Sequence, residues 1–299
     1  MMRSNRPNNT STVGSDRLGR QANTDFPLRS LLFVPGSRPD RFESALASGA
    51  DAVIIDLEDA VAPTDKEVAR ATVAQWVSRK HPVFIRINGR ATPWFEADAK
   101  LGALDGVAGL VLPKTESAKD IGALISIVRK KVPVFPLIET AQGMWTAMEI
   151  AKAPCVRRLM FGTLDFIAEM GMCDDREALN PYRAELALIS RVAGLQSPVD
   201  GVTPDIHDVG RLTLDTLNGR AHGFGAKLCI HPKQVPAIHE YYGLSEQDLV
   251  WATRVVEAAR HAEEGAIAVD GKMVDRPVLL RARQLLAFAD ALKQKALQA

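Results

Sequence analysis

Charged side chains follow a series of short apolar runs in this sequence, at the points where strands would end. The segments that carry them are Asp56-Leu57-Glu58-Asp59, Arg86-Ile87-Asn88, Pro113-Lys114, Glu139-Thr140 and Gly162-Thr163-Leu164-Asp165. In a closed parallel β/α barrel, residues just past the strand ends converge on one rim, where the chemistry takes place. Two carboxylates, an arginine and a lysine on such a rim would suit a hard metal ion and an anionic substrate.

Glu139 and Asp165 are the candidate metal ligands. They are separated by about one β/α unit, so they would end two neighbouring strands. Mg²⁺ is held by one or two carboxylates and keeps waters and substrate oxygens in its shell. Zinc is disfavoured because no His or Cys stands beside either residue. Each carboxylate alone fits equally well as a cap of the helix that follows it, but the matching positions of the pair favour a metal site.

Five charged residues are candidates for binding the substrate, namely Arg86, Lys114, Arg38, Glu58 and Asp59. Arg86, at the end of the third strand, can hold a carboxylate in a bidentate fork. A salt bridge to Glu58 or Asp59 is the structural alternative, and both hold if a carboxylate positions the guanidinium. Lys114 either stabilises developing negative charge or balances the carboxylates. Arg38, in the turn after the first strand, is a weaker candidate, which would bind phosphate together with backbone N–H groups.

The elements that must position these residues alternate regularly along the chain. Short apolar runs predict eight buried strands separated by helical stretches; the runs lie at 31–34, 52–55, 83–85, 107–112, 134–138, 158–161, near 199 and at 227–230. Eight such units in succession predict an α/β fold, the (β/α)8 TIM barrel. A doubly wound open sheet is the alternative, but neither a GxGxxG nor a GxxxxGK nucleotide turn occurs.

Three segments follow from this pattern. Residues 1–25 are polar and lack an apolar core, which predicts a flexible N-terminal tail. Residues 26–241 form the barrel, the catalytic domain. Residues 242–299 predict a C-terminal extension of helix, hairpin and helix, with the hairpin turn at Asp270-Gly271. The extension is too small to be an independent enzyme and would cover the mouth of its own barrel or that of a neighbouring subunit.

The overall composition argues against several classes of protein. The chain has 299 residues, 46% hydrophobic and 24% charged, as ordinary globular proteins have. Its net charge of +1 gives no electrostatic case for binding nucleic acid or a membrane surface. Its three cysteines lack CxxC spacing, so we expect no disulfide framework and a cytoplasmic location. No run approaches the ~20 apolar residues of a membrane span.

Taken as an ordered set, the motifs resemble a known family. They are Arg29-Ser30-Leu31-Leu32-Phe33-Val34-Pro35-Gly36, Asp56-Leu57-Glu58-Asp59-Ala60-Val61, Arg86-Ile87-Asn88, Pro113-Lys114, Ile138-Glu139-Thr140, Phe161-Gly162-Thr163-Leu164-Asp165 and Cys229-Ile230-His231-Pro232-Lys233-Gln234. The chain resembles the citrate lyase beta subunit-like family of the HpcH/HpaI aldolase superfamily, whose members include malyl-CoA and methylmalyl-CoA lyases. The similarity covers about residues 29–292.

The resemblance carries expectations beyond the patterns themselves. It implies a barrel that assembles as a homotrimer or hexamer, with Mg²⁺ held by Glu139 and Asp165 and with Arg86 holding the carboxylate of a 2-oxo acid. It also implies that Asp275 is a catalytic acid/base residue that reaches the adjacent subunit's site, so the extension would cover a neighbouring active site. One departure is Glu169, where relatives commonly carry aspartate, and it leaves the role of that loop open.

The expected activity is therefore that of a Mg²⁺-dependent carbon–carbon lyase. It would cleave or form a 3-hydroxyacyl-CoA thioester, with a 2-oxo acid and an acyl-CoA as the small-molecule partners. One alternative is a class II aldolase of free 2-oxo acids. The other is the beta subunit of a citrate lyase complex, which acts on an acyl-carrier-protein thioester and requires that protein as a partner.

Overall fold

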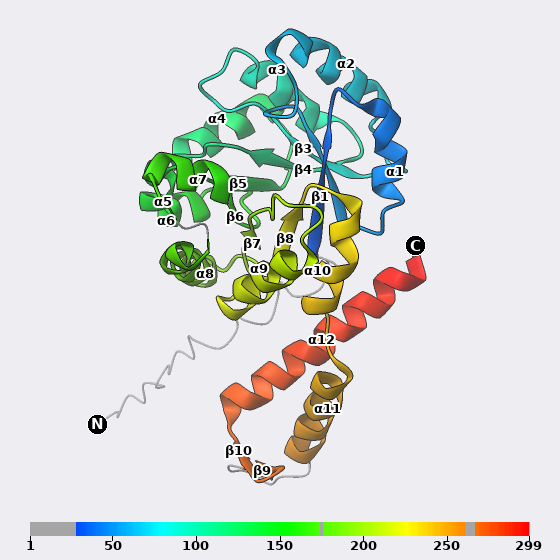
Figure 1. Cartoon of the computed structure of the whole chain (residues 1–299), viewed down its shortest axis with the longest axis vertical. Coiled ribbons are helices and arrows are strands. Elements are labelled where there is room, and N and C mark those ends of the chain that lie inside the picture. The colour runs from blue at the N-terminus through cyan, green and yellow to red at the C-terminus, as the bar shows by residue number, and fades with distance from the viewer. Residues whose placement is uncertain (1–27, 174–175, 261–266, 299) are drawn as a thin grey trace, which may run out of the picture. The chain divides into compact units, whose positions relative to one another are not determined.

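The computed structural model describes residues 28–173, 176–260 and 267–298 (Figure 1). The described chain forms two compact units, one of residues 28–251 and a second that begins at residue 252. The division falls inside α11 (Glu246–Arg260), later than the predicted boundary after residue 241. The predicted tail, residues 1–25, lies outside the described residues.

Eight parallel strands close into a barrel in chain order. They are β1 (Ser30–Pro35), β2 (Ala52–Asp56), β3 (Val83–Arg86), β4 (Val107–Leu112), β5 (Val134–Ile138), β6 (Met160–Phe161), β7 (Val199–Asp200) and β8 (Ala226–Cys229). β1 pairs with β2 on one side and with β8 on the other, so no edge is left open. The predicted (β/α)8 barrel is thereby confirmed, and the open-sheet alternative is wrong.

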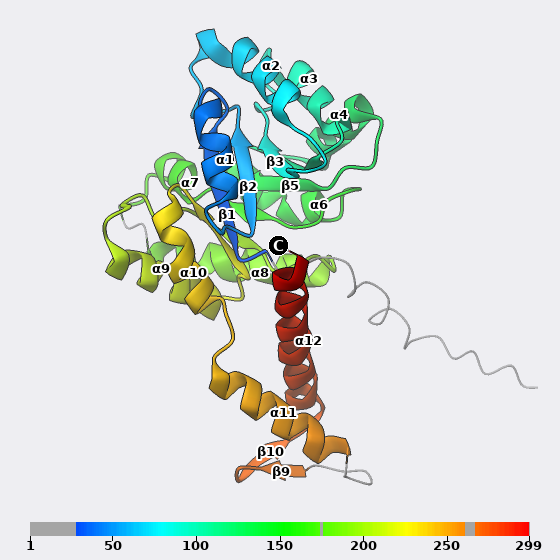
Figure 2. The same cartoon turned by 90° about the vertical axis from the view of Figure 1, so that its right-hand side faces the viewer.

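Helices follow the strands and surround the barrel, as the view turned by 90° also shows (Figure 2). They are α1 (Phe42–Leu46), α2 (Lys66–Trp76), α3 (Phe95–Ala99), α4 (Ala118–Val128), α5 (Ala141–Trp145), α6 (Ala147–Ala151), α7 (Thr163–Met170), α8 (Asn180–Val192), α9 (Val209–Ala221) and α10 (Val235–Tyr241). Short 3-10 turns precede several of them. Among the helices of the described ranges, none combines the length and apolar character that a membrane crossing requires.

Two separate apolar clusters form the core of the barrel unit. The larger one packs the outer faces of the strands against the helices. The smaller one fills the barrel interior with alternate strand residues, among them Ile54, Phe84 and Leu137. Because successive side chains of a strand point to opposite faces, the residues two positions further on face the barrel axis as well. Those residues are Asp56, Arg86 and Glu139, so the alternation places three charged groups at the barrel mouth.

The second unit contains a short hairpin followed by a long helix. Strands β9 (Ile267–Val269) and β10 (Lys272–Val274) pair antiparallel, and α12 (Arg276–Gln298) follows them. Asp270 and Gly271 have φ values of 54° and 71°, the left-handed pair that an Asp-Gly hairpin turn requires. The predicted turn is confirmed.

Candidate active site

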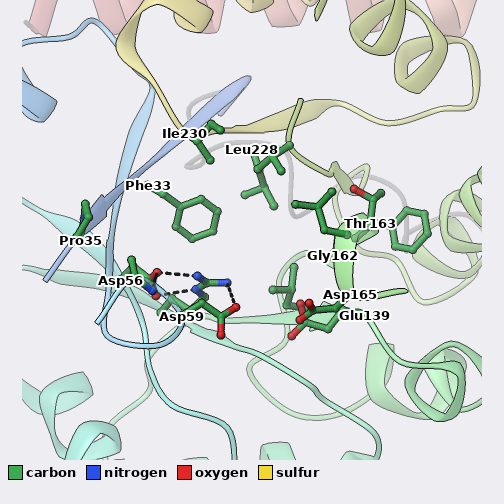
Figure 3. Close-up of a pocket in the computed structure, with 16 residues that line it drawn as sticks. Phe33, Pro35, Asp56, Asp59, Glu139, Gly162, Thr163, Asp165, Leu228 and Ile230 are labelled. Carbon is green, nitrogen blue, oxygen red and sulfur yellow. Dashed lines mark hydrogen bonds and ion pairs between the residues drawn. The ribbon is translucent and has the colours of Figure 1, made fainter. Parts of the chain in front are cut away.

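A cavity of about 430 Å³ lies at the carboxyl ends of the strands (Figure 3). Its charged lining comes from the ends of neighbouring strands and the segments just after them; the residues are Asp56, Asp59, Arg86, Glu139 and Asp165. This is the end of a β/α barrel at which catalytic groups are found. Four of the residues predicted from the sequence, Asp59, Arg86, Glu139 and Asp165, therefore meet in one cavity.

Arg86 is held in a fixed orientation by Asp56. The guanidinium Nε and Nη2 donate to the two carboxylate oxygens of Asp56, at 2.7 and 2.6 Å. Asp56 is 1% exposed, and its carboxylate also accepts from the backbone N–H groups of Glu58 and Ala60. The centroid of the Phe33 ring lies 4.7 Å from the guanidinium carbon of Arg86. Burial opposes the charge on Arg86, but the ion pair with Asp56 outweighs it and the pKa of Arg86 is raised.

Asp56 is a site residue that the sequence reasoning missed. Its signal was present, because Asp56 opens the first charged motif. It also lies directly opposite Arg86 in the pairing of β2 with β3. The bidentate geometry shows that a carboxylate positions the guanidinium, although Asp56 rather than Glu58 or Asp59 makes the stronger contact.

The remaining guanidinium nitrogen of Arg86 contacts two more acids. Nη1 lies 3.1 Å from Oε2 of Glu58 and 3.9 Å from Oδ2 of Asp59. The Glu58 oxygen is buried and receives no directed hydrogen bond, so its contact with Nη1 is an ion pair without hydrogen-bond alignment. Burial raises the pKa of Glu58. Arg86 thus lines the cavity and is salt-bridged at the same time.

Lys114 contacts both Glu58, an acidic partner of Arg86, and the two candidate metal ligands. Its backbone has a φ of 47°, in the left-handed region, and its N–H donates to Oε1 of Glu139 at 2.8 Å. Its Nζ lies 2.8 Å from Oε1 of Glu58 and 3.3 Å from Oδ2 of Asp165. Burial disfavours the charge, but the contact with Glu58 raises the pKa of Lys114 overall. This geometry fits the interpretation that Lys114 balances the carboxylates.

Glu139 and Asp165 lie at the same edge of the cavity (Figure 3). Glu139 is 3% exposed, whereas the side chain of Asp165, in the first turn of α7, is 44% exposed. Burial, and then the nearby charge of Glu58, raises the pKa of Glu139 to about 8. A carboxylate buried in this way is stabilised by a bound cation.

The donor set fits Mg²⁺ better than a transition metal. Within the described part of the chain, His, Cys, Asp and Glu side chains nowhere gather in a group of three or more that could hold a metal through protein ligands alone. Two carboxylates with no nitrogen or sulfur ligand leave coordination positions for waters and substrate oxygens, as Mg²⁺ requires. Gly162 also leaves room here, because a Cβ atom at this position would lie 2.4 Å from Oε2 of Glu139.

Three other residues singled out in the sequence have local partners within their own units. Arg38 is paired with its neighbour Asp40, through Nε and Nη2 at 2.9 and 2.7 Å, and does not line the cavity. Asp275 belongs to the second unit, where its carboxylate accepts from the N–H of Val278 and caps α12. Glu169 accepts from the N–H of Ala141 and so joins α7 to the start of α5. The substrate role of Arg38 and the acid/base role of Asp275 stay predictions.

This chain is similar both to relatives identified by sequence and to a protein of solved structure. At 35% identity, a citrate lyase subunit beta-like protein of Deinococcus radiodurans aligns over 87% of this chain and 96% of its own length. A (3S)-malyl-CoA thioesterase of Cereibacter sphaeroides is 36% identical over 91% of this chain and 98% of its own. The structure of CitE from Mycobacterium tuberculosis, in complex with magnesium, acetoacetate and coenzyme A, matches with a TM-score of 0.77 and 35% identity, over 88% of this chain and 98% of that one.

The model of one family covers most of the barrel. The HpcH/HpaI aldolase/citrate lyase model matches residues 29–232, a range that includes every strand of the barrel and all the charged residues that line the cavity. The resemblance noted in the motifs is confirmed, and this chain belongs to the HpcH/HpaI aldolase/citrate lyase family of enzymes.

Proposed function

We propose that this chain is a Mg²⁺-dependent carbon–carbon lyase acting on a 3-hydroxyacyl-CoA thioester. The observation that carries the proposal is that Glu139, Asp165 and Arg86 line one cavity. The carboxylate of Glu139 is buried, and the guanidinium of Arg86 is held in place by two hydrogen bonds to Asp56. The similar CitE of Mycobacterium tuberculosis was solved with magnesium and coenzyme A, which supports the same metal and the same thioester carrier here.

The reaction requires charge to move from an oxygen to a carbon. The C3 hydroxyl loses its proton, the C2–C3 bond breaks, and the carbonyl of a 2-oxo acid forms. The bonding electron pair stays on the thioester fragment as an enolate, which takes a proton on carbon to give the acyl-CoA. Condensation is the reverse of this path.

The residues of this chain would divide these tasks. Glu139 and Asp165 would hold Mg²⁺, which acts when bound as a Lewis acid toward the oxygens that gain negative charge. Arg86, kept charged and oriented by Asp56, would bind the carboxylate of the 2-oxo acid. Lys114, whose Nζ contacts both Glu58 and Asp165, would balance the negative charge of these carboxylates while the substrate enters.

Asp275 would handle the proton on the acyl carbon from a neighbouring copy of the chain. This role comes from the resemblance, and it requires a homotrimer or a hexamer in which the C-terminal extension covers the adjacent site. In the second unit, Asp275 is an exposed residue at the start of α12, so its carboxylate is accessible to a partner. General acid–base catalysis of this kind contributes about 10²–10⁴-fold to a rate.

Hydrolysis of the thioester is the second candidate function. It is favoured by the 36% identity to the (3S)-malyl-CoA thioesterase, which extends over 98% of that relative. The same site would bind the same class of substrate, but water would attack the thioester carbon. The products would then be a hydroxy acid and free CoA instead of a 2-oxo acid and an acyl-CoA.

The test is a product analysis with the full-length chain on malyl-CoA, methylmalyl-CoA and citryl-CoA, with Mg²⁺ and with EDTA. A 2-oxo acid and an acyl-CoA that appear only with Mg²⁺ would support the lyase. Free CoA without an oxo acid would favour hydrolysis, and turnover that survives EDTA would contradict the metal site. Absence of turnover on all three thioesters would shift the weight to the free aldolase, or to a carrier-protein complex, which a pull-down of the carrier protein would reveal.

The acid/base role is tested by Asp275→Asn, because asparagine can still cap α12 but cannot donate the proton. We expect turnover to fall by about 100-fold or more with the stability unchanged. Asp290→Asn, at an exposed position of the same helix, is the matched control. Equal turnover in the two variants would exclude Asp275 from the chemistry.

A further inference from the structure

Lys227 is a buried charged residue to which the proposed mechanism gives no task. It belongs to β8 and is 1% exposed. Its neighbours Ala226 and Leu228 belong to the cluster inside the barrel, so the side chain of Lys227 points outward, toward the helices. Burial lowers the pKa of Lys227, because the ammonium group has lost its water. A charge kept in such a place needs a contact that a nonpolar side chain could not make.

The acidic neighbour of Lys227 is already paired with another cation. Asp200 lies opposite Lys227 in the pairing of β7 with β8, and its Oδ1 accepts from Nε of Arg183 at 3.0 Å. The Nζ of Lys227 is 4.0 Å from Oδ2 of Asp200, beyond the range of a hydrogen bond. Balancing the charge of Asp200 therefore does not account for a second buried cation.

The directed contact of Lys227 is with the backbone that follows β7. Its Nζ donates to the carbonyl oxygen of Gly201 at 2.7 Å. β7 has two residues, and Val199 alone pairs with β6. The backbone hydrogen bonds of the sheet therefore hold the end of β7 weakly, and the ammonium group adds a hydrogen bond where the strand ends.

Gly201 in turn packs against the beginning of α7. A Cβ atom added at Gly201 would lie 2.2 Å from Oγ1 and 2.6 Å from Cγ2 of Thr163. Thr163 is the first residue of α7 and lines the cavity, and Asp165 lies in the same helical turn. The position of Gly201 therefore limits where the carboxylate of Asp165 can lie.

We propose that Lys227 is a positioning residue for the metal site, acting on Asp165 through the carbonyl of Gly201 and the side chain of Thr163. Without the ammonium group, Gly201 loses its buried donor and Thr163 loses its fixed neighbour. Asp165 then moves relative to Glu139, and the two carboxylates bind Mg²⁺ more weakly. This inference rests on the proposed metal site.

The test is a calorimetric titration of Mg²⁺ into the full-length chain, with thermal unfolding measured in the absence of the metal. Lys227→Met keeps an unbranched side chain but cannot donate, and it leaves Arg183 and Asp200 as a neutral pair. We expect this variant to keep a Tm close to that of the wild type and to bind Mg²⁺ about tenfold more weakly. Lys80→Met removes the same charge at an exposed turn before β3, and should leave the affinity unchanged.

A second variant separates positioning from stability. Asp200→Asn removes the counter-charge of Arg183 but keeps the hydrogen bond from Lys227 to Gly201, so we expect a lower Tm with Mg²⁺ affinity close to that of the wild type. The proposal is overturned if Lys227→Met binds Mg²⁺ as tightly as the wild type, or if both variants lose affinity to the same extent.

Two further outcomes are decisive. Should Lys227→Met not fold, Gly201→Ala takes its place, since its Cβ atom would displace Thr163 directly; wild-type Mg²⁺ affinity in that variant would overturn the proposal. Absence of Mg²⁺ binding by the wild type would contradict the metal site itself, and the role of Lys227 with it. Binding by the wild type that Lys227→Met leaves unchanged contradicts the role of Lys227 alone.

Discussion

Gly162 offers a direct test of the candidate metal site, because it lies against the side chain of Glu139. A Cβ atom added at Gly162 would lie 2.4 Å from Oε2 and 2.5 Å from Cβ of Glu139. The backbone φ of Gly162 is −85°, on the negative side that L-residues adopt. The effect of Gly162→Ala therefore comes from the contact with Glu139, and the left-handed strain that often accompanies loss of a glycine does not apply.

The size of the effect follows from these distances. Carbon atoms in contact prefer about 3.5–4.0 Å, so the Cβ of Glu139 must move by about 1 Å. Rotation of the carboxylate cannot relieve the clash, since Cβ is the base of the side chain. Overpacking of this kind costs about 1–3 kcal/mol of stability. A displacement of about 1 Å in a catalytic constellation costs about 100-fold in rate.

The assay combines calorimetric titration of Mg²⁺, lyase turnover and thermal unfolding. We expect Gly162→Ala to fold, to bind Mg²⁺ at least about tenfold more weakly and to lose about 100-fold of its turnover. The control is Gly122→Ala on α4, where a Cβ meets nothing within 4 Å. It should gain about 0.5–1 kcal/mol of stability and leave Mg²⁺ binding unchanged. Wild-type Mg²⁺ affinity and turnover in Gly162→Ala would refute the assignment of Glu139 to the metal.

Two further predictions concern the charges of the site. Between about pH 4.5 and 8 the metal-free chain should lose stability as the pH rises, because burial raises the pKa of Glu139 from 4.5 to about 8 and the unfolded chain gives up this proton first. Bound Mg²⁺ displaces the proton from Glu139. The rise in Tm on adding Mg²⁺ should therefore grow from pH 6 to pH 8, and a rise independent of pH would contradict the assignment of Glu139 to the metal. Asp56→Asn should lower the free energy of unfolding by about 3 kcal/mol, since it leaves Arg86 buried with its main counter-charge removed. It should also weaken binding of a 2-oxo acid in a titration with Mg²⁺ present, and wild-type affinity would exclude the positioning role of Asp56.

The sequence alone determined the architecture of the barrel and the composition of its mouth. Buried parallel strands must be apolar on both faces, so each one appears as a short apolar run that can be counted along the chain. The polar residue just past such a run belongs to the rim, which placed Arg86, Glu139 and Asp165 together before any contact was known. The turn at Asp270-Gly271 was equally predictable, because its positive φ values favour these residue types.

Only the tertiary structure decided which of these groups contact one another. The fork between Asp56 and Arg86 depends on the register of β2 against β3, and no local pattern encodes that register. Arg38 pairs with Asp40, two residues away, instead of lining the cavity, because the direction of a side chain in a turn depends on backbone angles that composition does not specify. Phe33 of β1 and Leu228 of β8 line the same cavity because closure of the barrel brings these two strands together. That pairing joins residues almost 200 positions apart in the chain, and it exists only in the folded state.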